Sequence, residues 1–184
     1  ASSDIDWMVA RAGQTAKGST RMRVQSVMQH ILSKFNVRIR IGDDLAANEG
    51  LTKVTLKDLT IGTFYAKGSF EQALDHTPSP TVASDLAADE WTVESTPVVS
   101  LVGAPNVVTD NVYTYVLESL ILPQSVRDDM TVLLHYSFTY SDGHVENYTF
   151  QMPLKDAFGV YFRTKADRLG YLWQINTGLE PKKG

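Results

Sequence analysis

The four histidines are the first candidates for chemistry, because imidazole binds metal ions and transfers protons near neutral pH. His30, His76, His135 and His144 lack the H-x-H or H-E-x-x-H spacing that brings two ligands to one face. His30 lies in an apolar stretch, and a zinc site would need further ligands beside it. We therefore predict a hydrogen-bonded structural role for His30 and no metal site in this chain.

Carboxylates and nucleophiles give no catalytic pattern. The adjacent acidic pairs are Asp43-Asp44, Asp89-Glu90 and Asp128-Asp129. None has the D-x-D-x-D-G spacing of a calcium loop, so solvated turns are favoured. A glycosidase needs two carboxylates facing each other across a cleft, which spacing alone neither shows nor excludes. Because a G-x-S-x-G elbow and a glycine-rich phosphate loop are also missing, we predict no catalytic residues, no cofactor and no enzymatic activity.

Aromatic side chains are the remaining candidates. Trp7, Trp91 and Trp173, together with eight tyrosines, could form a platform on which sugar rings stack. Trp91 and Trp173 lie in strand-like patterns, where packing in the core is favoured over a ligand platform. A carbohydrate-binding module that uses a tryptophan platform is therefore the alternative prediction.

Composition narrows the classes further. The chain has 184 residues, a net charge of -4 and no basic block beyond Lys182-Lys183, so a nucleic-acid partner is not expected. No run of about 18 apolar residues is present, and no membrane-spanning segment is predicted. The lack of cysteine excludes disulfides, and it fits both the cytoplasm and bacterial secreted proteins with a large β core. The first residue is not Met, which suggests a processed or trimmed end.

Alternating apolar and polar residues predict strands along most of the chain. Between residues 35 and 41, apolar side chains alternate with Arg38 and Arg40, which are expected to face water. Pro97 indicates an edge strand or a bulge. Eight to nine short strands without a long helix are typical of a β-sandwich or barrel. The predicted strands cover residues 5–9, 24–41, 51–61 with a slip near residue 58, 63–70, 91–101, 112–122, the two halves of 130–152, and 171–179; residues 71–90, with one helical turn at 86–89, and 103–111 are predicted as loops.

Residues 130–152 form the strongest local signal, a hairpin around Ser141-Asp142-Gly143. A two-residue loop would mix apolar and polar side chains on both faces. A three-residue loop with Gly143 in the left-handed region sorts them, because it pairs Tyr136 with Tyr148. The same register places His135 and His144 on opposite faces, where they cannot share a metal. We therefore predict the three-residue loop and a sheet with one buried face.

Five segments, in this order, resemble elements of the Bacteroidales fimbrillin family of type V pilus subunits. The most specific is H-I-L-S-K at residues 30–34, which leads into a strand. The five are residues 6–10, 30–39, 67–70 followed by Trp91, 121–124, and 170–175. Family members usually continue past the last of these strands, whereas this chain stops at Gly184, as expected for a short member or an excised N-terminal domain.

The resemblance implies an all-β fold, a transthyretin-like or immunoglobulin-like antiparallel β-sandwich of roughly seven to nine strands, in residues 24–184. It also implies a non-enzymatic pilus or adhesion subunit, exported as a lipoprotein to the bacterial outer-membrane surface. Such subunits assemble when a strand of one subunit completes the sheet of the next, so the expected partners are other pilus subunits, with host or bacterial receptors or glycans in addition. Membrane attachment would depend on a lipid anchor absent from this chain. Residues 1–23 are predicted as a short strand and a flexible segment, and the strand at 5–9 as the element that an incoming strand displaces.

Overall fold

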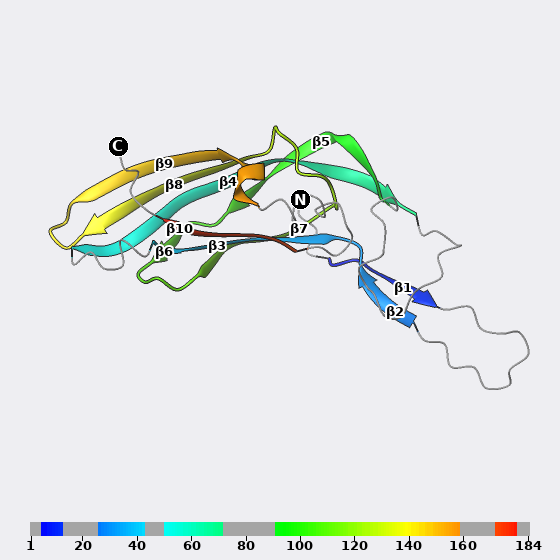
Figure 1. Cartoon of the computed structure of the whole chain (residues 1–184), viewed down its shortest axis with the longest axis horizontal. Coiled ribbons are helices and arrows are strands. Elements are labelled where there is room, and N and C mark those ends of the chain that lie inside the picture. Colours follow the sequence, from blue (N-terminus) through cyan, green and yellow to red (C-terminus); the bar gives the residue numbers. More distant parts are fainter. Residues whose placement is uncertain (1–4, 13–25, 43–49, 72–90, 159–171, 180–184) are drawn as a thin grey trace, which may run out of the picture.

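The computed structural model describes residues 5–12, 26–42, 50–71, 91–158 and 172–179, and most of these lie in strands (Figure 1). One short 3-10 helix, η2 (Leu154–Ala157), follows the ninth strand. The strands are β1 (Met8–Ala12), β2 (Ser26–His30), β3 (Ser33–Ile41), β4 (Leu51–Phe70), β5 (Trp91–Gly103), β6 (Asn106–Val108), β7 (Thr114–Ile121), β8 (Thr131–Tyr140), β9 (Val145–Pro153) and β10 (Leu172–Leu179).

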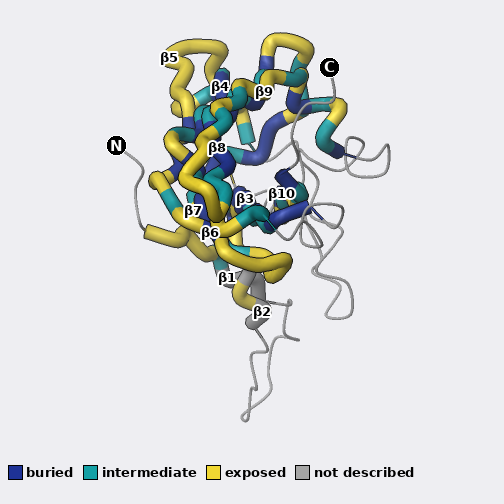
Figure 2. Tube along the Cα trace, turned by 90° about the vertical axis from the view of Figure 1, so that its left-hand side faces the viewer, coloured by how far each residue is buried: buried dark blue, intermediate teal, exposed yellow. Residues whose placement is uncertain are grey.

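Two sheets stack to form a β-sandwich, as predicted. The larger sheet has five strands in the order β5-β4-β8-β9, with β6 also paired to β4, and the smaller has the order β10-β3-β7. Figure 1 shows the larger sheet above the smaller one, and Figure 2 shows buried residues between them. Phe35 and Trp173 of the smaller sheet contact Phe64 of the larger at ring-centroid distances of 5.5 and 5.9 Å. This aromatic cluster joins the layers, because burial of one face of each sheet is the main source of stability.

The predicted hairpin register is confirmed. β8 and β9 pair Tyr136 with Tyr148 and His135 with Thr149, and Gly143 has a φ of 86°. The Tyr140 amide donates to the His144 carbonyl at 2.9 Å, which closes the three-residue loop. The buried face is less complete than predicted, because β9 is an edge strand and its Phe150 remains exposed.

Other strand boundaries differ from the predictions. The single strand predicted over 24–41 is two strands in different sheets, since Ile31 turns inward between them and is buried against Val9, Phe70 and Trp91. The strands predicted at 51–61 and 63–70 are one strand, β4, whose pairing with β8 shifts between Leu56 and Asp58. The loop predicted at 103–111 contains β6, because β4 extends far enough to pair with it.

The smaller sheet is mixed, since β10 runs parallel to β3 while β7 runs antiparallel to it. Pro97 lies on the edge strand β5, in a bulge where pairing jumps from Val98 to Glu94, as predicted. The helical turn predicted at 86–89 lies outside the described residues, as do His76, Asp43-Asp44 and Asp89-Glu90.

The N-terminal strand is observed three residues later than predicted and does not belong to either main sheet. β1 pairs with β2 in a separate two-stranded sheet, which extends from one end of the sandwich in Figure 1. Ile5, Trp7, Met8 and Met28 are exposed, with Trp7 at 57%. An isolated pair of strands is marginally stable in water. The β1–β2 pair, the N-terminal ladder, therefore depends on its few contacts with the sandwich.

Candidate interaction groove

A groove separates the edge strands β5 and β7, which lie in opposite sheets. In the described part of the chain, each of these strands pairs on one side only, β5 with β4 and β7 with β3. They meet at one end, where the Ala104 amide donates to the Val116 carbonyl at 3.1 Å. Gly103 permits this approach, since a Cβ there would lie 2.9 Å from the Val116 carbonyl oxygen. Beyond this point the strands diverge and leave the groove between them.

The groove encloses about 710 Å³ and is lined mainly by apolar side chains. Its floor includes the core residues Phe64, Leu117 and Ile121, whereas Val99 and Val102 at the rim are exposed. Exposed apolar side chains along an unpaired strand edge are unusual in a soluble sheet, because they invite another strand to pair there. The run Val98-Val99-Ser100-Leu101 was predicted only as part of a strand that ended at residue 101, before Val102. The sequence does contain a sign of an apolar edge surface here. Apolar residues occupy both faces of a strand in which Pro97 indicates an edge.

Gln124 and Arg127 do not line the groove but a smaller pocket next to it, which shares Tyr65 with the groove. The Gln124 side chain accepts from the Tyr65 amide at 2.9 Å and donates to the Tyr65 carbonyl at 3.2 Å, so its amide occupies the place of a neighbouring strand. The Arg127 guanidinium lies 3.7 Å from the Tyr65 ring centroid and donates to Asp129 at 3.1 Å and to the Thr63 carbonyl. These contacts anchor the segment between β7 and β8 onto β4.

Asp129 belongs to the same anchor. The Thr63 hydroxyl donates to Asp129 at 2.7 Å, and this hydrogen bond, together with Arg127, lowers the pKa of the carboxyl. The neighbouring Asp128 bonds Lys155 at 2.9 Å. The pair Asp128-Asp129 therefore makes separate structural contacts on the surface of the loop.

The N-terminal ladder reaches the other end of the groove. Leu32 lines the groove, and the amide of the preceding Ile31 donates to the Trp7 carbonyl at 3.0 Å. The side chain of Val9 packs against Ile31, while the Trp91 indole donates to the Ile31 carbonyl at 2.8 Å. The segment that leads into β1 is therefore bonded to the residue next to Leu32, at the end of the groove.

The described histidines each contact a carboxylate. His30 bonds Asp6 at 2.8 Å, which agrees with the predicted hydrogen bond, but its side chain is exposed and not in an apolar setting. His135 and His144 lie on opposite faces of the hairpin, as predicted, and contact Asp58 and Glu146. Among the described residues, no three His, Asp or Glu side chains come together in a way that could hold a metal ion.

Glu146 organises the tip of the β8–β9 hairpin. It accepts from the Tyr148 hydroxyl at 2.7 Å and from the Tyr140 hydroxyl at 3.0 Å. The bond to Glu146 raises the pKa of Tyr148 to about 12, and the two tyrosine hydroxyls lower the pKa of Glu146. Burial, reinforced by Glu146, raises the pKa of Tyr140. This cluster fixes the tip through neutral tyrosines and an ionised carboxylate.

The three tryptophans do not form one platform. Trp173 is fully buried in the core, as predicted, and Trp7 is exposed near the N-terminal ladder. Trp91 is half-buried against Phe70 and lines a smaller pocket of about 250 Å³ with Tyr65. No helix in the described ranges is long and apolar enough to cross a membrane.

Comparison with known proteins gives no matching family model and no matching curated protein. One match among solved structures is a protein from Bacteroides uniformis described as a "putative cell adhesion protein", with 17% sequence identity and a TM-score of 0.44. The match covers 95% of this chain and 56% of that protein, so this chain spans a little over half its length.

Proposed function

We propose that this chain is a non-enzymatic subunit of a fimbrial or related adhesive structure at the bacterial cell surface, which joins its neighbours by β-strand addition. The observation that carries the proposal is the apolar groove between the two edge strands β5 and β7. The resemblance of residues 6–175 to fimbrillins supplies the cellular setting, including the lipid anchor and the outer-membrane location.

Strand addition has a direct physical basis at this groove. An incoming extended segment would bond to the free backbone groups of β5 or β7, since each has a strand on one side only in the described chain. Every second side chain of that segment would point inward, onto Leu117, Ile121 and Phe64. Backbone bonds would supply affinity, and the shape of the apolar floor would select the sequence.

The N-terminal strand is the element that we expect to be displaced. Deletion of residues 1–23 would remove β1 and uncover the edge of β2 beside Ile31. We expect the truncated chain to self-associate and to melt at a lower temperature than the intact chain. Analytical ultracentrifugation and thermal melting test this, and a monomer with unchanged melting would contradict the displacement.

Charged substitutions test the groove itself. Val99→Lys and Val102→Lys place ammonium groups at the rim, where charges oppose strand pairing. We expect both variants to suppress self-association of the truncated chain without altering its fold. Val112→Lys, at a valine between β6 and β7 that is 63% exposed against 67% for Val102, is the matched control. Association that persists in both rim variants would place the contact elsewhere.

The pocket at Trp91 favours a second function, carbohydrate binding. It combines two aromatic side chains, Trp91 and Tyr65, with the polar groups of Gln124 and Arg127. A sugar ring would stack on Trp91, because Arg127 already covers one face of Tyr65 and the Gln124 amide bonds the Tyr65 backbone. Quenching of tryptophan fluorescence by neutral glycans, lost in Trp91→Phe but retained in Trp7→Phe, would support this function.

A further inference from the structure

The outer face of the smaller sheet carries two arginines and two tyrosines in close contact. Arg38 and Arg40 of β3 face away from the core, and the Tyr113 ring centroid lies 5.2 Å from the Arg38 guanidinium carbon and 5.1 Å from that of Arg40. The Tyr115 ring centroid lies 5.5 Å from the guanidinium carbon of Arg38. Both rings therefore lie within cation–π distance of the Arg38 guanidinium.

A β-bulge creates this arrangement. β3 and β7 pair Val37 with Leu117 but Arg38 with Tyr115, so Val116 is the extra residue. In a regular ladder without the bulge, Val116 would lie opposite Arg38. Tyr115 would then lie opposite Ile39 and point into the core. Bulges of this kind redirect side chains and are frequent beside functional sites. Here the bulge brings an aromatic ring, 48% exposed, next to a cation.

Arg38 retains hydrogen-bonding capacity. Its Nε donates to the Asn176 side chain at 2.9 Å, and its two terminal nitrogens make no hydrogen bond and no ion pair with any described residue. Glu118, on the same face, is already paired with Lys34 at 2.9 Å. The terminal N–H groups of this guanidinium, which bond no described residue, match the two oxygens of a carboxylate, which accepts both.

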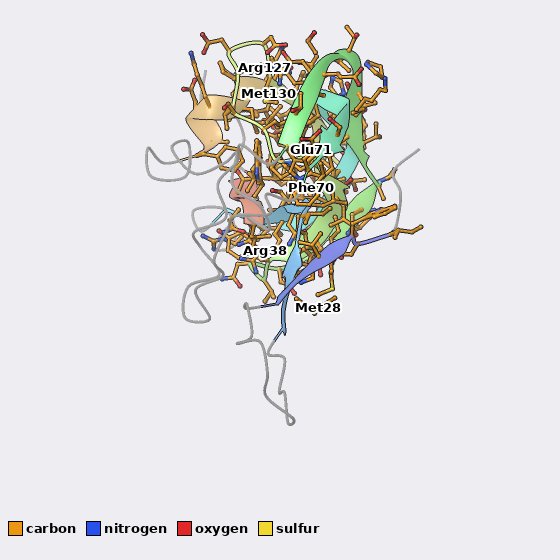
Figure 3. All side chains as sticks on the ribbon, turned by 90° about the vertical axis from the view of Figure 1, so that its right-hand side faces the viewer. Met28, Arg38, Phe70, Glu71, Arg127 and Met130 are labelled. Carbon is orange, nitrogen blue, oxygen red and sulfur yellow. The ribbon has the colours of Figure 1, made fainter. Side chains whose placement is uncertain are left out.

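We propose that Arg38, Tyr113, Tyr115 and Asn176 form a binding site for a carboxylated sugar, such as a sialic or uronic acid residue of a glycan. The ligand carboxylate accepts from the Arg38 terminal nitrogens, and its ring packs on Tyr115. An acidic peptide fits less well, because β3 is paired on both sides and offers no backbone edge. None of these four residues lines the groove. Figure 3 shows Arg38 well separated from Arg127, which lines the smaller pocket.

Titration of the full chain with sialyllactose and with hyaluronan oligosaccharides tests the proposal, with tyrosine ring signals followed by NMR. We expect binding of at least one carboxylated sugar and none of lactose. Arg38→Gln should weaken binding about tenfold or more, because two charge-assisted bonds are lost. Arg38→Lys should restore it only in part, since an ammonium cannot bond in the same fork.

Tyr115→Leu is a second variant that leaves the charge in place and should weaken binding through lost stacking. Lys53→Gln, at an exposed cation on the other sheet, is the matched control and should bind as the unaltered chain does. The proposal is overturned if neither carboxylated sugar binds, if Arg38→Gln binds as well as the unaltered chain, or if a polyglutamate peptide binds more tightly than the sugars. Melting curves confirm that each variant is folded, and if Arg38→Gln is not, Tyr115→Leu decides.

Discussion

The β8–β9 hairpin and the β1–β2 ladder are both antiparallel pairs without a register break, yet their surroundings differ. One face of β8 is buried under the smaller sheet, with Phe138 fully enclosed between Tyr136 and Tyr148. Met8 and Met28 of the ladder stay exposed. Backbone pairing is therefore present in both regions, but the hairpin packs on the main core, whereas the ladder has only the small cluster around Ile31.

This difference matters for the proposed assembly. A strand that is to be exchanged must be held weakly, whereas the sheet that receives its replacement must remain folded. The ladder meets the first condition and the sandwich meets the second.

Truncation of a buried ring in the hairpin should cost far more than truncation in the ladder. Phe138→Ala removes a fully buried side chain, and we expect a loss of about 3–5 kcal/mol in the free energy of unfolding. Met28→Ala, at a side chain that is 54% exposed, should change it by less than about 0.5 kcal/mol. Urea denaturation measures both values, and similar losses would remove the contrast between the regions.

Ile31 should control the ladder without controlling the sandwich. Ile31→Ala leaves a cavity beside Val9, Phe70 and Trp91. We expect the free energy of opening the ladder to fall by about 2–3 kcal/mol, the lower part of the usual range for Ile→Ala, because the cluster is small. Hydrogen exchange should accelerate in β1 and β2 but not in β8. Val112→Ala, at an exposed side chain, is the control. Equal acceleration in both regions would show that they unfold as one unit.

The same contrast explains how much of the fold the sequence could predict. The hairpin register followed from local alternation, because one face is buried and a slip of one residue would expose it. The break between β2 and β3 at Ile31 could not be predicted from local alternation, since it depends on contacts with Phe70 and Trp91, which are distant in the chain. The parallel pairing of β10 with β3 joins segments over a hundred residues apart and leaves no local period.

For the candidate sites, the sequence predicted the setting of single residues but not how strands bring them together. Arg38 and Arg40 were expected to face water, but their stacking on Tyr113 depends on how β3 and β7 pair. The groove arises from the divergence of two edge strands in different sheets. Neither arrangement is visible in the order of residues along one strand.

Gly143→Ala tests the hairpin loop. With a φ of 86°, a residue with a Cβ is strained, although no atom lies within 4 Å of the added carbon. We expect a loss of about 1 kcal/mol in unfolding free energy, which arises from the backbone alone. Ser141→Ala, in the same loop, should be close to neutral. If Gly143→Ala is also neutral, the loop does not depend on the left-handed conformation.

Glu146→Gln should give the smallest effect, because Glu146 and its tyrosine partners are only half-buried. In the native chain the pKa of Tyr148 is raised to about 12 from its ordinary value of 10.0 by the bond to Glu146. Stability from this bond is fully present below pH 10 and is lost as the pH rises toward 12, since the unfolded chain ionises first. In Glu146→Gln the pKa should fall toward its ordinary value, and the alkaline decline in stability should become shallower. NMR titration of ring-labelled tyrosine measures the pKa, and Glu94→Gln, which removes a strand carboxylate paired with Lys67, should leave it unchanged. A Tyr148 pKa that stays high in Glu146→Gln would mean that burial, rather than the carboxylate, raises this pKa.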